Sequence, residues 1–308
     1  PHLDDAGNAL AEFPTAACAG VNGPVVLLSA HLDTVFPPGT PTEPTEADTR
    51  ILAPGACDNA AGLSGLLALA SVAGLSAPAG TPVSPDPSWR VGRLLVSDDF
   101  DRGLDHWTTE LEKGGTVVAH EGRLEINVPG GATVWLKEPV EGPLLITYEA
   151  TVIKAGGPND RVSDLNCFWM ARDARSPADI FATPRSGAFA GYDQLKCYYV
   201  GLGGNTNTTT RFRRYVGEKG NRPILPEHDL TAKEFLLTPN VAQEIQLVAA
   251  GNDIAYWRDG RRIFSFDDPE PYRRGWFAFR TTWNHMAVRH FRIYALELNP
   301  VSPSAPSH

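Results

Sequence analysis

The chain has 308 residues, and 27 Lys and Arg against 36 Asp and Glu give it a formal net charge of −9. This acidic balance argues against a nucleic-acid-binding module, which needs a basic face to displace counterions from phosphates, and the absence of any run of about 18 apolar residues predicts no membrane-spanning helix. The 29 Gly and 26 Pro indicate a chain rich in turns, which favours β structure and loops over helical bundles.

Residues 1–76 have the pattern of a small α/β segment. The continuous apolar run from Pro24 to Ala30 predicts a strand buried on both faces. His31 and Asp33 follow this strand, and Asp58 opens a predicted helix that ends near residue 75. A His-x-Asp at the end of a strand, followed by an Asp at the start of a helix, is one way in which α/β folds collect metal ligands.

These two motifs resemble those of the zinc aminoacylase and carboxypeptidase family of metallopeptidases. The resemblance implies that His31 binds one metal ion, that Asp33 orients this histidine, and that Asp58 bridges two metal ions. The segment lacks the Glu-Glu pair, the further carboxylate and the distal His of that family, whereas a catalytic zinc site keeps at least three protein ligands. We therefore interpret residues 1–76 as a truncated remnant that requires no zinc. A peptidase completed by another chain is the alternative.

The composition changes near residue 88, since all seven Trp and all eight Tyr follow this point. Residues 77–93 are rich in small residues and proline, which is typical of a semi-extended linker. Residues 94–298 form the predicted main domain, and residues 299–308 form a tail that we expect to be disordered.

The main domain consists of about a dozen short apolar runs separated by turn residues. This spacing predicts a mainly-β protein built as one β-sandwich or jelly roll. The Asp259-Gly260 pair between two of these runs predicts a tight hairpin. The expected strands cover residues 116–119, 123–128, 133–137, 144–153, 165–172, 197–202, 208–216, 244–249, 254–258, 262–266, 276–282 and 288–296.

The hairpin, followed by residues 275–280 and 291–294, resembles the end of concanavalin-like jelly rolls, in which the last strands return beside the first. The runs 161–173, 198–215, 222–230 and 276–286 resemble an uncharacterised bacterial family of such proteins, encoded among polysaccharide-degrading enzymes. This resemblance implies a carbohydrate-active, secreted or periplasmic protein. Its expected ligand is a polysaccharide or oligosaccharide, with no nucleic-acid or membrane partner.

One strand carries a cationic face. The alternation of side chains places Thr209, Arg211, Arg213 and Tyr215 on the same side, with Phe212 on the other side toward the core. Arginine suits planar, bidentate recognition of carboxylates. A solvated basic strand that pairs with acidic neighbours is the alternative.

Other polar residues in the same domain could complete a cleft for an acidic sugar. β-Elimination of a uronate needs a cation or amide at the carboxylate, a base at the C5 proton and an acid at the leaving oxygen. We expect Arg211 and Arg213 at the carboxylate, His228 or His285 as base, and Tyr199 or Tyr215 as acid, with no cofactor. The further expected binding residues are Asn166, Asn205, Arg280 and Asn284.

Two other functions stay open. A non-catalytic binding module would use the same arginines and aromatic residues to hold a glycan. A glycoside hydrolase would need two carboxylates at a set separation, and the scattered candidates are Asp164, Asp173, Asp193, Glu227 and Asp229. Aromatic platforms for a sugar could come from Trp169, Tyr199, Tyr215 and Trp283, although large aromatic residues also dominate sandwich cores.

Two smaller features leave alternatives. Asp99 and Asp101 could form part of a structural calcium site, because Ca²⁺ prefers hard oxygen ligands, or they could lie in a solvated acidic turn. Cys167 and Cys197 lie in strand-like runs and could form a disulfide or stay as two buried thiols.

Overall fold

Alternating burial along the strands shows how the sequence builds a layered protein. In β8 (Arg123–Val128), Leu124, Ile126 and Val128 are buried, and the residues between them are half-buried. β11 (Leu144–Val152) alternates in the same way from Tyr148 onward. One face of each strand is therefore available to pack against a second layer. The computed structural model describes residues 2–3, 9–10, 45–47, 50–52 and 84–299.

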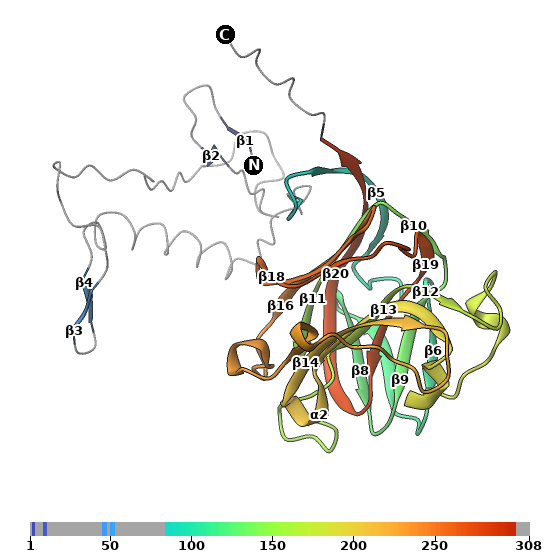
Figure 1. The fold of residues 1–308 in the computed structure, drawn as a ribbon. Coiled ribbons are helices and arrows are strands. Elements are labelled where there is room, and N and C mark those ends of the chain that lie inside the picture. The colour runs from blue at the N-terminus through green and yellow to red at the C-terminus, as the bar shows by residue number, and fades with distance from the viewer. Residues whose placement is uncertain (1, 4–8, 11–44, 48–49, 53–83, 300–308) are drawn as a thin grey trace, which may run out of the picture. The chain divides into compact units, whose positions relative to one another are not determined.

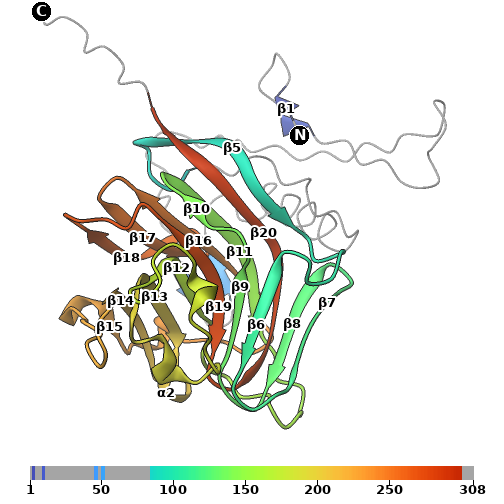
Figure 2. The ribbon, with the colours of Figure 1, turned by 90° about the vertical axis from the view of Figure 1, so that its right-hand side faces the viewer.

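Residues 84–299 form two antiparallel sheets that lie face to face (Figures 1 and 2). The first sheet has the order β15 (Asp229–Leu230), β14 (Thr209–Val216), β13 (Leu195–Gly203), β12 (Asn166–Asp173), β19 (Arg274–Thr281), β9 (Ala132–Leu136) and β6 (Trp107–Leu111), and β10 (Val140–Glu141) pairs with β19. The second sheet has the order β18 (Arg261–Asp267), β17 (Asp253–Arg258), β16 (Gln243–Ala250), β11, β20 (Asn284–Leu298), β8 and β7 (Thr116–His120), and β5 (Trp89–Asp98) pairs with β20.

The main hydrophobic core lies between the two sheets. Its centre is a cluster of aromatic rings in which the centroids of Phe277 and Phe279 lie 4.8 Å apart, and those of Tyr148 and Phe279 5.1 Å apart. Tyr148 and Phe291 come from the second sheet, and the centroid of Phe291 lies 5.1 Å from that of Trp107. Each fully buried large apolar side chain contributes about 1.5–3 kcal/mol to folding.

The predicted jelly-roll sandwich is confirmed in its strands and in the return of the last strand beside the first. Each of the twelve expected strands corresponds to a strand of the structure, with ends that differ by a few residues. The last strand, β20, lies beside the first, β5, with Phe291 opposite Asp98. In the Asp259-Gly260 hairpin the two turn residues have φ of 51° and 73°, as a two-residue turn with left-handed backbone requires.

The main domain begins earlier in the chain than the change in composition suggests. β5 starts at Trp89 and pairs with the end of β20, where Trp89 lies opposite Leu298. Asn299 then donates its backbone N–H to Ser88 O at 2.9 Å. Residues 89–93, assigned above to a linker, thus belong to the second sheet.

The N-terminal unit, Pro1–Pro82, is described only in its backbone at four short strands. β1 (His2–Leu3) pairs with β2 (Ala9–Leu10), and β3 (Thr45–Ala47) pairs with β4 (Arg50–Leu52). The expected strand at 24–30, the expected helix, and the candidate metal ligands His31, Asp33 and Asp58 lie outside the described residues, as does the tail from residue 300. Among the described residues, no helix combines the length and apolar character needed to cross a membrane.

The two cysteines of the main domain are both buried free thiols. Cys167 belongs to the core between the sheets, whereas Cys197 belongs to a second cluster on the opposite face of the first sheet. They therefore do not form a disulfide, and burial raises the pKa of the Cys167 thiol to about 12.

Candidate functional site

The outer face of the first sheet, opposite the main core, carries a row of polar residues. Glu110, Thr133, Arg280 and Asn166 are directly opposed on the consecutive strands β6, β9, β19 and β12. Toward the other edge, Arg211 of β14 lies between Gly201 of β13 and Asp229 of β15. Residues that oppose each other in antiparallel strands share a face. Six polar side chains thus lie along one line across the sheet.

The segment 174–194 covers part of this outer face. It contains the 3-10 helices η2 (Ile180–Ala182) and η3 (Phe189–Tyr192), and it packs Ile180 and Tyr192 against Trp135 and Phe168 of the sheet. An ion-pair network fastens it, because the buried Arg185 lies 3.0 Å from both Glu110 and Asp173.

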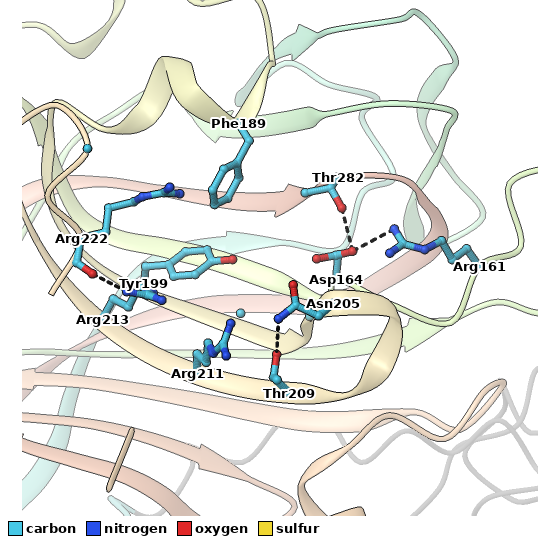
Figure 3. A pocket seen from close by; sticks show the side chains of 13 residues that line it. Arg161, Asp164, Phe189, Tyr199, Asn205, Thr209, Arg211, Arg213, Arg222 and Thr282 are labelled. Atoms are coloured by element: carbon cyan, nitrogen blue, oxygen red, sulfur yellow. Dashed lines mark hydrogen bonds and ion pairs between the residues drawn. The ribbon is translucent and has the colours of Figure 1, made fainter. Parts of the chain in front are cut away.

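Beside this segment the outer face is hollowed into a cleft of about 490 Å³ (Figure 3). Four of its lining residues are arginines, and only one, Asp164, is a carboxylate. The lining consists of Arg161, Asp164, Phe189, Tyr199, Gly201, Gly204, Asn205, Thr209, Arg211, Arg213, Gly220, Arg222 and Thr282.

Tyr199 lies along its own strand because Gly201 has no side chain. A Cβ on Gly201 would lie 2.7 Å from the Tyr199 hydroxyl oxygen. The ring also packs on Phe168 and Tyr215, with centroids 5.3 and 5.5 Å away. Burial raises the pKa of Tyr199 well above its usual value, so its hydroxyl stays protonated. Phe189 points toward this ring from across the cleft (Figure 3).

Three arginines gather at one end of the cleft. Arg211 forms a bidentate pair with Asp229, at 2.8 and 3.0 Å, and Arg222 lies 3.4 Å from Asp193 and 4.5 Å over the Phe189 ring. Arg213 lies between them.

Arg213 has no carboxylate partner within residues 84–299. Its Nη1 donates to the backbone oxygen of Arg222. Burial lowers the pKa of Arg213, and repulsion by Arg211 and Arg222 adds to this effect. A half-buried cation that its own protein leaves without a carboxylate favours binding of an external anion.

The other end of the cleft has an ion pair between Arg161 and Asp164 and is rich in hydrogen-bonding groups. Asp164 accepts hydrogen bonds from Thr282 at 2.7 Å, Ser163 at 2.6 Å and Arg161 at 3.2 Å, so its carboxylate is already engaged. Its backbone has φ of 60°, a left-handed conformation uncommon for a residue with a side chain. Asn205 donates to Thr209 at 3.2 Å.

The expected binding residues largely come together. Asn205, Arg211, Arg213 and Tyr199 line the cleft, and Asn166 and Arg280 lie buried in the polar row beside it. Tyr215 lies beneath the cleft in the second apolar cluster.

Asn284 has a supporting position. It is buried and donates to the backbone oxygens of Ser163 at 2.7 Å and Asp164 at 3.3 Å. It therefore holds the loop that carries Asp164.

The structure does not bring the two histidines to the cleft. His228 is buried among Phe212, Phe264 and Phe266, and one ring nitrogen lies 3.1 Å from Ser265 O. Because Phe212 faces the main core, His228 lies on the opposite side of β14 from Arg211 and Arg213. His285 lies in the second sheet, where its ring nitrogens are 2.9 Å from Asp160 and 3.0 Å from Glu125.

The remaining expected residues lie apart from the cleft. Both oxygens of Asp99 accept hydrogen bonds from Arg292, at 2.7 and 2.8 Å, and Asp101 is exposed. Within residues 84–299, no three His, Cys, Asp or Glu side chains are grouped as metal ligands. Trp169 is buried in the main core, whereas Trp283 is 42% exposed and lies against Arg161.

Sequence reasoning missed four cleft residues, and it named Asp164 only as a candidate carboxylate for hydrolysis. Arg161, Arg222 and Thr282 lie within the runs that carry the family resemblance, which was the available signal. Phe189 lies in the covering segment, where the sequence has no periodic pattern, and nothing in the sequence points to it.

The chain was compared with known families and structures. A model of the family described as a domain of unknown function (DUF6250) matches residues 126–291. The chain belongs to this family. A model of peptidase family M28 matches residues 9–80, which confirms the resemblance of the N-terminal segment to a peptidase fragment. No curated protein matches the chain.

The chain is also similar to several solved structures. A Bacillus subtilis protein of unknown function with a galectin-like fold is 16% identical, with a TM-score of 0.53, over 68% of this chain and 100% of that chain. β-Agarase A from Zobellia galactanivorans is 10% identical, with a TM-score of 0.47, over 72% of this chain and 98% of that chain. The carbohydrate-binding module CBM66 from Bacillus subtilis is 12% identical, with a TM-score of 0.41, over 62% of this chain and 95% of that chain.

Proposed function

We propose that the cleft of this DUF6250 domain binds an acidic glycan, with a sugar carboxylate at Arg213. The observation that carries the proposal is the half-buried Arg213, which lies between two arginines that have carboxylate partners while it has none within residues 84–299. An incoming carboxylate would neutralise this charge and gain charge-assisted hydrogen bonds.

The rest of the cleft suits a sugar ring. Sugars combine apolar faces with a rim of hydroxyl groups, and Phe189 and Tyr199 offer two aromatic surfaces on opposite walls. Asn205, Thr209 and Thr282 offer neutral donors and acceptors. A small number of polar groups placed around aromatic walls is typical of small-ligand sites.

Within this proposal, binding is favoured over cleavage. β-Elimination needs a base at the C5 proton, but burial keeps the Tyr199 hydroxyl protonated and neither His228 nor His285 lines the cleft. Hydrolysis needs two carboxylates, and Asp164 is the single carboxylate in the described lining. A lyase remains the second outcome of the test below, because Tyr199 could serve as its acid.

Calorimetric titration with polygalacturonate, alginate and glucuronate-containing oligosaccharides, and with their neutral counterparts, tests the proposal. We expect binding of at least one acidic glycan and about 10- to 100-fold weaker binding by Arg213→Gln, which corresponds to the loss of one charged hydrogen-bonding group. Arg172→Gln is the control, because Arg172 is exposed on β12 and outside the cleft. Equal affinity for acidic and neutral glycans, or an unaffected Arg213→Gln variant, would contradict the proposal. A rise in ultraviolet absorbance from an unsaturated product would identify a lyase.

A further inference from the structure

Arg280 is a buried cation with three of its five N–H donors unused. Its side chain is fully buried, and its Nη1 donates to Gly187 O at 2.6 Å and to Thr133 Oγ1 at 3.2 Å. Its Nε and Nη2 have no hydrogen-bond partner, and no carboxylate of residues 84–299 pairs with it. Burial of a charge without a counterion is destabilising. This guanidinium is therefore a group that a ligand could satisfy.

The two unused atoms define the chemistry of that ligand. Nε and Nη2 form one edge of the guanidinium, and this edge can hold both oxygens of a carboxylate at once. Arg211 uses the same edge to bind Asp229, at 2.8 and 3.0 Å. Arg280 presents an equivalent edge with no such carboxylate, so a carboxylate fits it better than a neutral group.

An unused acceptor lies on the neighbouring strand. Asn166 is directly opposite Arg280 in the neighbouring strand, and its Oδ1 is buried without a partner. Its Nδ2 donates to Asp164 Oδ1 at 3.3 Å, which fixes the orientation of the amide. A hydroxyl donor beside the carboxylate would satisfy Oδ1. A uronate residue has this combination, since its carboxylate lies near ring hydroxyl groups.

Two aromatic rings pack against the Arg280 guanidinium. Its carbon lies 4.6 Å from the ring centroid of Tyr192 and 5.9 Å from that of Phe189, and the Phe189 centroid also lies 4.5 Å from the Arg222 guanidinium carbon. Phe189 lines the cleft and is 36% exposed. Rotation of this side chain toward solvent would open the cleft toward Arg280 and Asn166.

We propose that Arg280 and Asn166 form an inner subsite behind Phe189, which receives the carboxylate and an adjacent hydroxyl of a uronate residue. This inference rests on the proposed binding of acidic glycans and names uronates as the acid sugar. The inner subsite is distinct from the carboxylate position at Arg213, so an experiment can contradict one proposal without contradicting the other.

The test uses the full chain, D-glucuronate and its uncharged amide. We expect glucuronate, but not the amide, to raise the thermal unfolding midpoint and to bind in calorimetry. Arg280→Lys keeps the charge but removes the bidentate edge, so affinity should fall about 10- to 100-fold. The matched control is Arg292→Lys, which changes an arginine of the second sheet that pairs with Asp99 and should not alter binding. Phe189→Ala should speed association with glucuronate-containing oligosaccharides.

A measurement on the unaltered protein covers the case in which Arg280→Lys does not fold. Glucuronate should shift the NMR signal of the Arg280 Nε–H. The inner subsite is wrong if that signal is unmoved at saturation, or if Arg280→Lys binds like the parent while Arg213→Gln does not. Failure of the parent protein to bind glucuronate would overturn it too. Binding of polygalacturonate or alginate that Arg213→Gln weakens would then leave the broader proposal standing.

Discussion

The orientation of Tyr199 depends on a residue two positions away. Side chains at i and i+2 share a face of a strand. Gly201 leaves that space empty, so the phenol ring of Tyr199 can lie along the strand as one wall of the cleft. A longer residue at position 201 would lift the ring into the space that we assign to a sugar.

We expect Gly201→Ala to destabilise the protein by about 1–3 kcal/mol, the range for overpacking, and to weaken glycan binding. The reason is the 2.7 Å approach of the added Cβ to the Tyr199 hydroxyl oxygen. Urea denaturation and calorimetric titration measure the two effects. Gly204→Ala is the matched control in the same cleft, because its nearest new contact is 3.3 Å, to Thr209 Oγ1. Equal effects of the two substitutions would contradict this interpretation.

At the scale of elements, the covering segment 174–194 is held by buried charges. Arg185 lies between Glu110 and Asp173, and its guanidinium carbon also lies 5.3 Å from the ring centroid of Trp135. The contacts join β6, β9, β12 and the segment. Since Phe189 belongs to the same segment, this network also sets one wall of the cleft.

Arg185→Met should reduce the free energy of unfolding by about 3–5 kcal/mol, because it leaves buried carboxylates without their shared cation. Arg175 is the other arginine that pairs with Asp173, and its side chain is 37% exposed. Arg175→Met should therefore reduce the free energy of unfolding by only about 0–1 kcal/mol. Chemical denaturation of both variants gives the comparison. A loss below that of Arg175→Met would show that the network does not hold the segment.

The loop before Asp164 contains a pH-dependent contact. Asp160 accepts hydrogen bonds from the backbone N–H groups of Ala155 and Gly157. These two hydrogen bonds, together with the contact to His285, lower the pKa of Asp160 to about 2. The unfolded chain titrates this carboxyl near pH 3.9. Its contribution to stability is therefore present above about pH 4 and is lost as the pH falls toward 2.

Asp160→Asn removes this titration. The difference in unfolding free energy between the parent protein and the variant should be largest near pH 6 and should shrink between pH 4 and pH 2, in the window that the lowered pKa defines. Denaturant titrations across this range measure it. A difference that stays constant with pH would mean that the carboxylate charge is not what the backbone amides recognise.

Local patterns predicted the strands and their faces, but not which strands become neighbours. The face shared by Arg211 and Arg213, with Phe212 opposite, follows from alternation within one strand. The position of His285 depends on the register of β20 against β8 and on the loop that carries Asp160. The position of Phe189 depends on how a loop without periodicity folds over the sheet. Such long-range contacts leave no mark in a single segment, so the cationic strand could be predicted and its surroundings could not.

At the scale of the whole molecule, the chain consists of two units, Pro1–Pro82 and Val83–His308. The second has its own hydrophobic core, the paired sheets and the entire described cleft. The N-terminal match to a peptidase family ends at residue 80, which agrees with this division.

A chain reduced to residues 84–299 should therefore fold alone, with a thermal midpoint and a glycan affinity close to those of the full chain. Calorimetry and titration of the two chains side by side check this. Metal chelators should leave glycan binding unchanged in both. A shortened chain that aggregates, or that loses affinity, would show that the first unit completes the fold or the site of the second.

Cys167 on β12 and Cys197 on β13 lie on opposite faces of the first sheet. Their reactivity therefore reports which face of the sheet becomes exposed to solvent. A thiol-modifying reagent reaches Cys197 once the segment over the outer face lifts away, whereas it reaches Cys167 only when the two sheets part. In the chain reduced to residues 84–299, which lacks Cys18 and Cys57, relative labelling rates would thus separate local exposure of the binding surface from global unfolding.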